Sequence, residues 1–515
     1  MTTATLNRRD LEFILFDWLD VASLCDRPRF AMHSRAETFE PILSMADRLA
    51  AEQFATHAAK LDAHEPTFDG ERVVLLPEVR EALDAFIEAG FLSASFDTEH
   101  GGLQLPYSIH QAAMALFYAA NTSTAAYPML SMAAANLLAT HANAEQRKRY
   151  LAPLLDGRAF GTMCLSEPHA GSSLSDIRTV AKPADDGTYR LVGNKMWISG
   201  AEHDLSDNII HLVLAKIPGG PPGVKGISLF IVPKFLIHDD GTLGARNDVA
   251  ISGLNHKMGY RGTVNTVLNL GEDQGGAVGY LVGEPHRGLT LMFHMMNEAR
   301  IGVGLGAAAL GCAGYRFSLN YARERPQGRL PWNKGPASPP VPILEHPDVR
   351  RMLLAQKAWS EGGLALCLYC ARLVDEMKSV DNDATRDALS MLLDILTPIA
   401  KAWPSEYALE ANKLAIQVLG GYGYSTEYPV ERLYRDNRLN AIHEGTNGIQ
   451  ALDLLGRKVT MRQGAAFRLL MDRISRTLST AREYPSLQEH TQALSEAHAR
   501  VQATTAALAQ TALQG

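Results

Sequence analysis

The chain has 515 residues, which is enough for two to four domains of ordinary size. Hydrophobic residues make up 46% and charged residues 20%, a composition that excludes a disordered or fibrous protein. The 49 basic residues against 56 acidic ones give a formal net charge of −7. This balance argues against a protein that binds the phosphate backbone of nucleic acids irrespective of sequence.

The N-terminal region predicts neither a targeting peptide nor a membrane span. Acidic residues at Asp10, Glu12 and Asp17 interrupt it, and its continuous apolar stretch, Phe13–Phe16, is too short for a signal sequence. No stretch of the chain reaches the roughly 18 apolar residues that a membrane helix needs. Five scattered cysteines indicate a reducing compartment, so we expect a cytoplasmic protein.

Two of these cysteines form a Cys367-x-x-Cys370 motif. The chain has no second CxxC and no histidine pair at zinc spacing, and the motif lies in the apolar run LALCLYCARL. Core packing is therefore favoured over metal binding or redox chemistry, and we predict no metal site.

In chain order, the pattern predicts an α+β fold with helices at both ends. Residues 1–160 are rich in helix formers with apolar positions three and four apart, as in 42–61 and 109–120, and predict an N-terminal helical domain. Residues 161–285 predict a middle, mostly antiparallel, β-barrel-like domain. Residues 286–460 predict a C-terminal helical bundle, and residues 461–515 a helical C-terminal extension.

The middle region is distinguished by short segments rich in Val, Ile, Tyr and Trp. Asp186-Gly187 is a strong hairpin-turn signal, and it precedes a strand expected over 188–199. Further strands are expected over 208–217, 226–235 and 262–271.

The C-terminal region begins with a predicted long helix over 289–325. It contains Gly302-x-Gly304-x-x-Ala307, which matches the dinucleotide fingerprint GxGxxG/A. That fingerprint requires a preceding strand, whereas the preceding residues here are helix-periodic. We therefore interpret these small residues as a surface for close helix packing.

Two segments of the middle region could contact a ligand. Met163–Ser173 combines Pro168 and Gly171 with several hydroxyls, and its alternatives are a polar or anionic ligand site and a domain-joining turn. In the segment Lys195–Ser199, strand alternation places Trp197 and Ser199 on one face. This Trp could support a flat aromatic ligand, although a strand Trp is usually a core residue.

The segment IHEGTNGIQ contains the most informative carboxylate. Asn447 and Gln450 have capping-box spacing, which predicts a helix that starts near Gly448. Glu444 then lies in the preceding turn, beside Gly445. From the residues alone, Glu444 could be a catalytic group, a partner of the helix dipole or a solvent-exposed loop charge.

Three segments resemble the acyl-CoA dehydrogenase family in order and spacing: MCLSEPHAGS, KMWIS, and QVLGGYGYSTEYPVERLYRD leading into IHEGTNGIQ. The resemblance covers roughly residues 75–460. The segments EHDLSDNIIHLVLAKI, RERPQGR and HPDVRRMLL are similar to a larger bacterial branch that includes the 3-methylmercaptopropionyl-CoA dehydrogenases. The family's helix–strand–helix plan agrees with the order of elements expected above.

The resemblance implies FAD as cofactor, an acyl-CoA substrate, an electron-transferring flavoprotein or similar acceptor, and a homodimer or homotetramer. It assigns FAD contacts within one subunit and across to its neighbour. The expected FAD-binding residues are Met163, Leu165, Ser166, Gly171, Ser172, Trp197, Ser199 and Thr446, with Arg325, Gln327, Gln417, Gly420 and Gly421 reaching the FAD of the neighbouring subunit. The expected substrate-binding residues are Ser172, Asn297, Arg300 and Gly445.

Glu444 matches the family's catalytic base. Some relatives place the base on the long helix instead, where this chain has Ala299, and Glu298 would point about 100° around the helix from that position. The implied reaction is 2,3-dehydrogenation: Glu444 removes the α-proton of the thioester and FAD accepts the β-hydride. We expect burial beside flavin and acyl chain to raise the pKa of Glu444, which makes it a better base.

Four positions depart from common family residues: His169, Ser173, His443 and Gly448. Two rival functions share the fold. One is a flavoprotein that acts on a non-CoA substrate, like the nitroalkane oxidases. The other is a DNA-associated alkylation-response relative that would use arginines of the C-terminal tail, and the negative net charge and the presence of Glu444 disfavour it.

Overall fold

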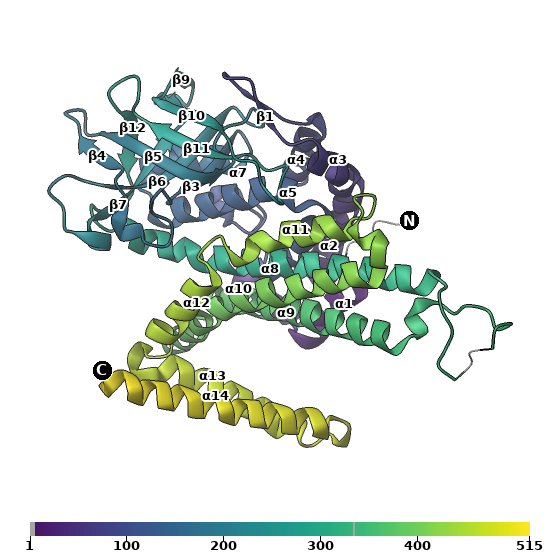
Figure 1. Ribbon diagram of the computed structural model, residues 1–515. Helices are drawn as coiled ribbons and strands as arrows, with labels where there is room; N and C mark the ends of the chain where they lie inside the picture. Colours follow the sequence, from purple (N-terminus) through teal and green to yellow (C-terminus); the bar gives the residue numbers. More distant parts are fainter. Residues whose placement is uncertain (1–5, 333–334, 515) are drawn as a thin grey trace.

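Helices from both ends of the chain flank a β region (Figure 1). The computed structural model describes residues 6–332 and 335–514. The α+β prediction, with helices, then a β region, then a helical bundle, is confirmed. Two details differ from the sequence pattern: a two-residue hairpin, β1 (Thr67–Phe68) with β2 (Val73–Val74), lies among the first helices, and the β region begins at Ala159.

The N-terminal helices pack around one very apolar helix, α5 (Tyr107–His141). Most of α5 is buried on all sides, as expected for a helix that is apolar around its whole circumference. It bends at Asn121, whose backbone is not helical (φ −159°, ψ 90°). The other helices of this region are α1 (Arg8–Glu12), α2 (Glu40–Leu49), α3 (Ala58–Ala63), α4 (Pro77–Glu88), α6 (Ala144–Gln146) and α7 (Ala152–Leu155).

The β region is an eight-stranded sheet in the order β10-β11-β5-β12-β7-β6-β3, with β4 bridging β5 and β6. This bridge closes β4, β5, β12, β7 and β6 into a ring, which gives the barrel-like shape. Most pairs are antiparallel, and β3–β6 and β4–β6 are parallel. The strands are β3 (Ala159–Cys164), β4 (Val180–Pro183), β5 (Tyr189–Ser199), β6 (Asn208–Lys216), β7 (Ile227–Pro233), β10 (Val249–Leu254), β11 (Asn265–Leu270) and β12 (Ala277–Leu281), and β8 (Phe235–Ile237) pairs separately with β9 (Leu243–Arg246).

Three long helices form the C-terminal bundle, α8 (Gly288–Glu324), α9 (Pro347–Ser379) and α10 (Asp383–Leu419). Shorter helices α11 (Val430–Arg438) and α12 (Asn447–Asp453) follow. The chain then forms a helical hairpin, α13 (Met461–Ala481) and α14 (Gln488–Gln514), which extends away from the bundle in Figure 1. The predicted long helix and the helical tail are both confirmed.

Small residues of α8 let α10 approach closely. A Cβ on Gly304 would lie 1.9 Å from the carbonyl oxygen of Ala400, and one on Gly311 would lie 2.8 Å from the Cβ of Ala408. Gly302-x-Gly304-x-x-Ala307 therefore lies inside a helix and serves helix packing, as predicted. It is not a dinucleotide fingerprint.

The five cysteines are free, and Cys367 and Cys370 are fully buried in α9. Burial raises the pKa of the Cys370 thiol to about 12, and the Cys367 thiol lies 3.6 Å from the carbonyl oxygen of Ala400. These contacts confirm core packing. Across residues 6–332 and 335–514, no cluster of three or more His, Cys, Asp or Glu is arranged to hold a metal ion, and no helix is long and apolar enough to cross a membrane.

The close approach of α8 and α10 predicts opposite outcomes for two neighbouring glycines. Gly304→Ala places a methyl group against Ala400 and is expected to destabilise the fold by about 2 kcal/mol or more. The control is Gly302→Ala, whose Cβ would have Tyr118 Oη as its nearest neighbour, 4.0 Å away, and helix propensity favours this change by about 0.5–1 kcal/mol. Thermal unfolding of both variants checks this, and an unchanged midpoint for Gly304→Ala would contradict it.

Candidate active site

The turn before α12 holds Glu444 in a left-handed conformation. Its φ is +52°, and Gly445 follows at +85°. A non-glycine residue in this region typically costs about 1–3 kcal/mol, and such residues concentrate at functional sites. The buried amide of Gln450 donates to the carbonyl oxygens of Glu444 (3.1 Å) and Gly445 (3.2 Å), and so stabilises the turn.

The capping box predicted from Asn447 and Gln450 is not formed at the start of α12. Thr446 is the N-cap, and its hydroxyl accepts from Ile449 N at 3.3 Å. Asn447 instead contacts α10: its Oδ1 accepts from Lys401 Nζ (3.2 Å) and Ser405 Oγ (3.1 Å), and its amide donates to a glutamate of the same helix. Long-range contacts with α10 outcompete the local cap, and they fix the turn against the bundle.

Two buried cations lie near Glu444. Burial raises the pKa of the Glu444 carboxyl, and the charges of Lys401 and Arg300 oppose that rise. Arg300 is paired with Asp453 at 2.6 Å. Lys401 is fully buried, and burial lowers its pKa to about 8, opposed by the charge of Glu444. The half-buried carboxylate of Glu444 is therefore both desolvated and placed in a positive field.

The alternative carboxylate, Glu298, is bound elsewhere. It accepts a hydrogen bond from Asn136 of α5. Arg300, two residues further along α8, is buried. The side chain of Asn297 lies outside the described residues, so its predicted substrate contact stays a prediction. Of the two candidate bases, Glu444 is the one whose carboxyl group interacts with two buried cations.

A buried ion pair fixes the loop that follows β3. Glu167 accepts from Lys195 Nζ of β5 at 2.9 Å, from Thr179 Oγ1 at 2.6 Å, and from the backbone N–H groups of Arg178 and Thr179. Burial raises the pKa of Glu167, but Lys195 and these donors hold it below its ordinary value. The structure thus brings together the two segments that the sequence singled out, MCLSEPHAGS and KMWIS.

Several of the predicted ligand residues lie at the end of β3 and in the loop that follows it. Met163, Leu165 and Ser166 are half-buried, and Gly171 and Ser172 are exposed, with open space around Gly171. Ser166 O accepts from Met196 N at 2.9 Å.

Strand β5 bulges at its end, because Lys195 pairs with Leu268 whereas Ile198 pairs with Thr266. Trp197 lies in this bulge with φ +66° and is 61% exposed. A bulky residue at positive φ is strained, so an exposed indole held there offers a flat apolar surface beside the loop. Ser199, two residues on, accepts from Asn265 Nδ2 at 3.0 Å.

The remaining predicted residues lie at the far end of the bundle. Arg325 caps α8 and donates to Gln327 Oε1 at 3.0 Å. Gln417, Gly420 and Gly421 are exposed at the end of α10, with open space around both glycines. Arg300 and Arg325 are separated by about 37 Å along α8 at 1.5 Å per residue. One chain therefore presents these five residues far from its own Glu444.

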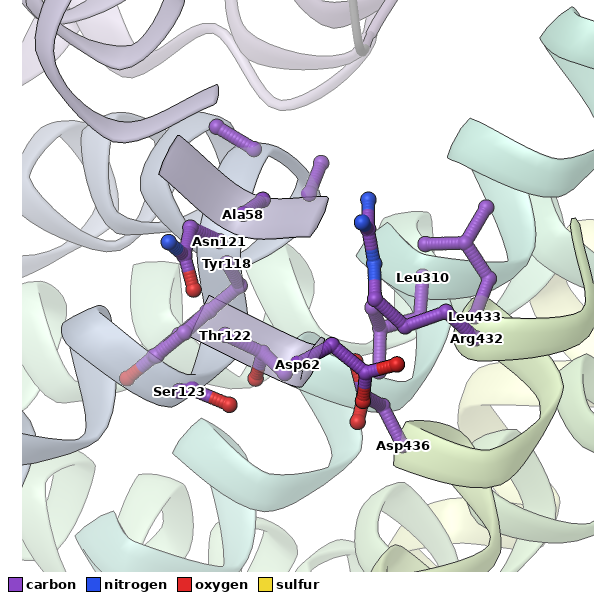
Figure 2. A pocket seen from close by; sticks show the side chains of 12 residues that line it. Ala58, Asp62, Tyr118, Asn121, Thr122, Ser123, Leu310, Arg432, Leu433 and Asp436 are labelled. Atoms are coloured by element: carbon purple, nitrogen blue, oxygen red, sulfur yellow. The ribbon is translucent and has the colours of Figure 1, made fainter. Parts of the chain in front are cut away.

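The sequence did not single out Lys401, Asp453 or Glu167. Lys401 carried a usable signal, since it is a lone charge within the apolar run ILTPIAKAW of α10. The sequence predicts Gln450 as a capping-box residue, whereas its side chain stabilises the turn at Glu444 and Gly445. A separate small pocket, with Asp62, Arg432 and Asp436 in its lining, contains none of the predicted site residues (Figure 2).

Comparison with known proteins identifies the family. Residues 36–158, 162–270 and 286–460 match the models of the N-terminal, middle and C-terminal domains of acyl-CoA dehydrogenases. A 3-methylmercaptopropionyl-CoA dehydrogenase of Ruegeria pomeroyi is 41% identical over 430 residues, which cover 84% of this chain and 72% of the relative. The chain therefore belongs to the acyl-CoA dehydrogenase family.

Two solved structures are similar to the fold. ACDH-11 of Caenorhabditis elegans, in complex with C11-CoA, has a TM-score of 0.80 at 19% identity and covers 96% of this chain and 83% of its own. An acyl-CoA dehydrogenase of Bacillus anthracis, complexed with FAD, has a TM-score of 0.69 at 25% identity and covers 86% of this chain and 70% of its own. The chain is an oxidoreductase that dehydrogenates acyl-CoA with a flavin cofactor.

Removing one partner of the Glu167–Lys195 pair is expected to destabilise the protein strongly. Lys195→Met leaves the Glu167 carboxylate buried without its cation, which typically costs about 3–5 kcal/mol. Lys182→Met, at an exposed position of β4, is the matched control and should have little effect. Thermal unfolding together with flavin content of the purified protein measures both, and an unchanged midpoint for Lys195→Met would show that the pair is dispensable.

Proposed function

We propose that Glu444 is the catalytic base, that the flavin is FAD, and that the product is the trans-2-enoyl-CoA. The observation that carries this proposal is the placement of Glu444: a strained turn holds one partly desolvated carboxylate within the field of two buried cations. A thioester α-proton is far less acidic than a carboxylic acid. A base that removes it must therefore be more basic than an exposed glutamate and rigidly positioned.

The residues around Glu444 have distinct parts in this proposal. Glu444 takes the α-proton onto its carboxylate, and its backbone N–H donates to the thioester oxygen as negative charge develops there. One such donor is typically worth about 3 kcal/mol. Gly445 lets the substrate approach the turn closely, and Arg300, neutralised by Asp453, forms the wall beside it. The bound flavin would supply the acceptor for the β-hydride.

The residues present fit FAD. The exposed indole of Trp197 can support an aromatic ring system, and Ser166, Ser172, Ser199 and Thr446 offer hydroxyls. Buried polar atoms near the base, Arg300 Nε and Gln450 Oε1, have no hydrogen-bond partner among the described residues, as expected where a polar ligand completes a site. We assign Met163, Leu165 and Gly171 to the same FAD site, and Ser172 also to the acyl-CoA.

The predicted FAD-binding residues at the far end of the bundle support an oligomer in this proposal. Arg325, Gln327, Gln417, Gly420 and Gly421 lie too far from Glu444 to contact the same flavin within one chain, and they are accessible to the FAD of a neighbouring copy. A homodimer or homotetramer satisfies this arrangement. Its electron acceptor is proposed to be an electron-transferring flavoprotein, and its compartment the cytoplasm, where free cysteines persist.

The family matches also support the proposed division into domains, 1–160, 161–285, 286–460 and the extension 461–515. The two rival functions are not favoured, because the relatives that match most of this chain are named acyl-CoA dehydrogenases. Of the tail arginines, Arg462 is paired with Asp387 of α10.

The base assignment is tested by two carboxylate substitutions. Glu444→Gln removes the proton acceptor with little change in shape and should lower kcat by about 10³-fold or more, with flavin still bound. Glu298→Gln, on α8, should retain kcat within about tenfold. Flavin bleaching across a panel of acyl-CoA thioesters with an artificial electron acceptor measures both. Loss of activity in Glu298→Gln alone would reverse the assignment.

Lys401 should control the pH at which the base works. Activity needs the carboxylate form of Glu444, so it falls as pH decreases through the pKa of that group. Lys401→Met removes a cation that favours the carboxylate, and the acidic limb of kcat/KM should move to higher pH. Lys413→Met, on the exposed side of α10, is the control and should leave the profile in place. A shift to lower pH in Lys401→Met would contradict the prediction.

A further inference from the structure

A series of buried side-chain amides connects α8 to the residue that precedes Glu444. Asn412 of α10, Asn437 of α11 and Asn440 are all essentially inaccessible to solvent. Asn412 Nδ2 donates to Leu310 O at 2.9 Å, and Asn437 Nδ2 donates to Asn412 Oδ1 at 2.6 Å. Small residues of α8 make room for this series, because a Cβ on Gly314 would lie 2.5 Å from Asn412 Nδ2.

Two backbone carbonyls fix the direction of every bond in this amide series. A carbonyl oxygen can only accept, so Leu310 O fixes the orientation of the Asn412 amide. Ala307 O fixes that of Asn437 in the same way, at 3.1 Å. Asn437 Oδ1 is then left as an acceptor, and it accepts from Asn440 Nδ2 at 3.0 Å.

The last bond of the series determines the tautomer of His443. Because Asn440 donates through Nδ2, its Oδ1 is an acceptor, and two groups reach it: His443 Nε2 at 3.1 Å and Tyr260 Oη at 3.3 Å. Both must donate. His443 therefore carries its proton on Nε2, and in the neutral ring Nδ1 has the lone pair.

The surroundings of His443 favour its neutral form. Burial lowers the pKa of His443 to about 3, and Lys401 of α10 contributes to this shift. The Tyr260 ring, from the β10–β11 connection, lies edge-on to the imidazole, with centroids 6.3 Å apart. The other charged groups nearby have partners of their own. Asp436 of α11 accepts a hydrogen bond from Tyr260 N at 2.6 Å, and Arg300 of α8 forms an ion pair with Asp453.

We propose that His443 is a positioning residue for the proposed base, held as the Nε2–H tautomer by the amide series so that the turn carrying Glu444 keeps its left-handed conformation. Gln450 restrains the carbonyl groups of Glu444 and Gly445 from the C-terminal side. His443 and Asn440 provide the restraint on the N-terminal side. Glu444 is thereby fixed from both directions, without a hydrogen bond that would consume its carboxylate among the described residues.

The test compares three substitutions in the flavin-loaded enzyme. His443→Phe keeps a flat ring and removes the donor, and it should lower kcat by about 10- to 100-fold with little change in KM. His443→Gln retains an N–H donor and should recover most of that loss. Asn412→Leu, at the far end of the series and without contact with the site, should lower kcat in the same way but less.

Two further measurements separate positioning from a general effect on folding. A relaxed turn admits water to Glu444, so the acidic limb of the pH–kcat profile should move to lower pH in His443→Phe and return in His443→Gln. His110→Phe is the matched control. His110 is another buried histidine, it lies in α5, and its Nε2 donates to Phe91 O at 3.1 Å. Its loss should reduce stability without moving the pH profile.

The inference rests on Glu444 as the base, and the two can fail separately. If Glu444→Gln remained active, the proposed function itself would be wrong. If Glu444→Gln were inactive while His443→Phe kept wild-type kcat and pH profile, the positioning role would be overturned and the base assignment would stand. A loss of kcat in His443→Phe that His443→Gln does not recover would likewise overturn it.

Discussion

The proposed chemistry depends on keeping one carboxylate partly out of water while leaving it free to accept a proton. Desolvation makes Glu444 more basic, but an uncompensated buried charge is costly. The structure meets both demands by placing cations near Glu444 and directing their hydrogen bonds elsewhere. Arg300 is bound to Asp453 and Lys401 to Asn447, so neither forms a short pair that would reduce the basicity of Glu444.

This arrangement requires a rigid bundle, and α8 supplies it through its small residues. Gly304 lets the backbone of α10 approach at Ala400, next to Lys401. Gly314, further along, makes room for Asn412 and so for the amide series that leads to His443. Helix packing and active-site geometry thus share one surface, and a substitution that widens the α8–α10 contact displaces the groups that surround the base.

The sequence predicted what local pattern and family motif encode. Helical and strand periodicity gave the α–β–α order, Asp186-Gly187 gave the β4–β5 hairpin, and the motif around Glu444 gave the candidate base. Features that depend on distant contacts were not predictable. The cap at Thr446 replaced Asn447 because Asn447 finds partners on α10, and the bulge at Trp197 depends on pairing with β11.

With Glu444 as the proposed base, the charges of the site give the buried cation Lys401 a role in the reaction. Before the reaction, Glu444 is the anion and Lys401 balances it at a distance. In the proposed reaction, proton removal makes Glu444 neutral and moves the negative charge to the thioester oxygen, so the total charge of the site does not change. In this proposal the buried Lys401 contributes positive charge to the site both before and after the step. A fixed cation that serves both states requires no reorganisation during the step, which is the property that makes a preorganised site faster than water.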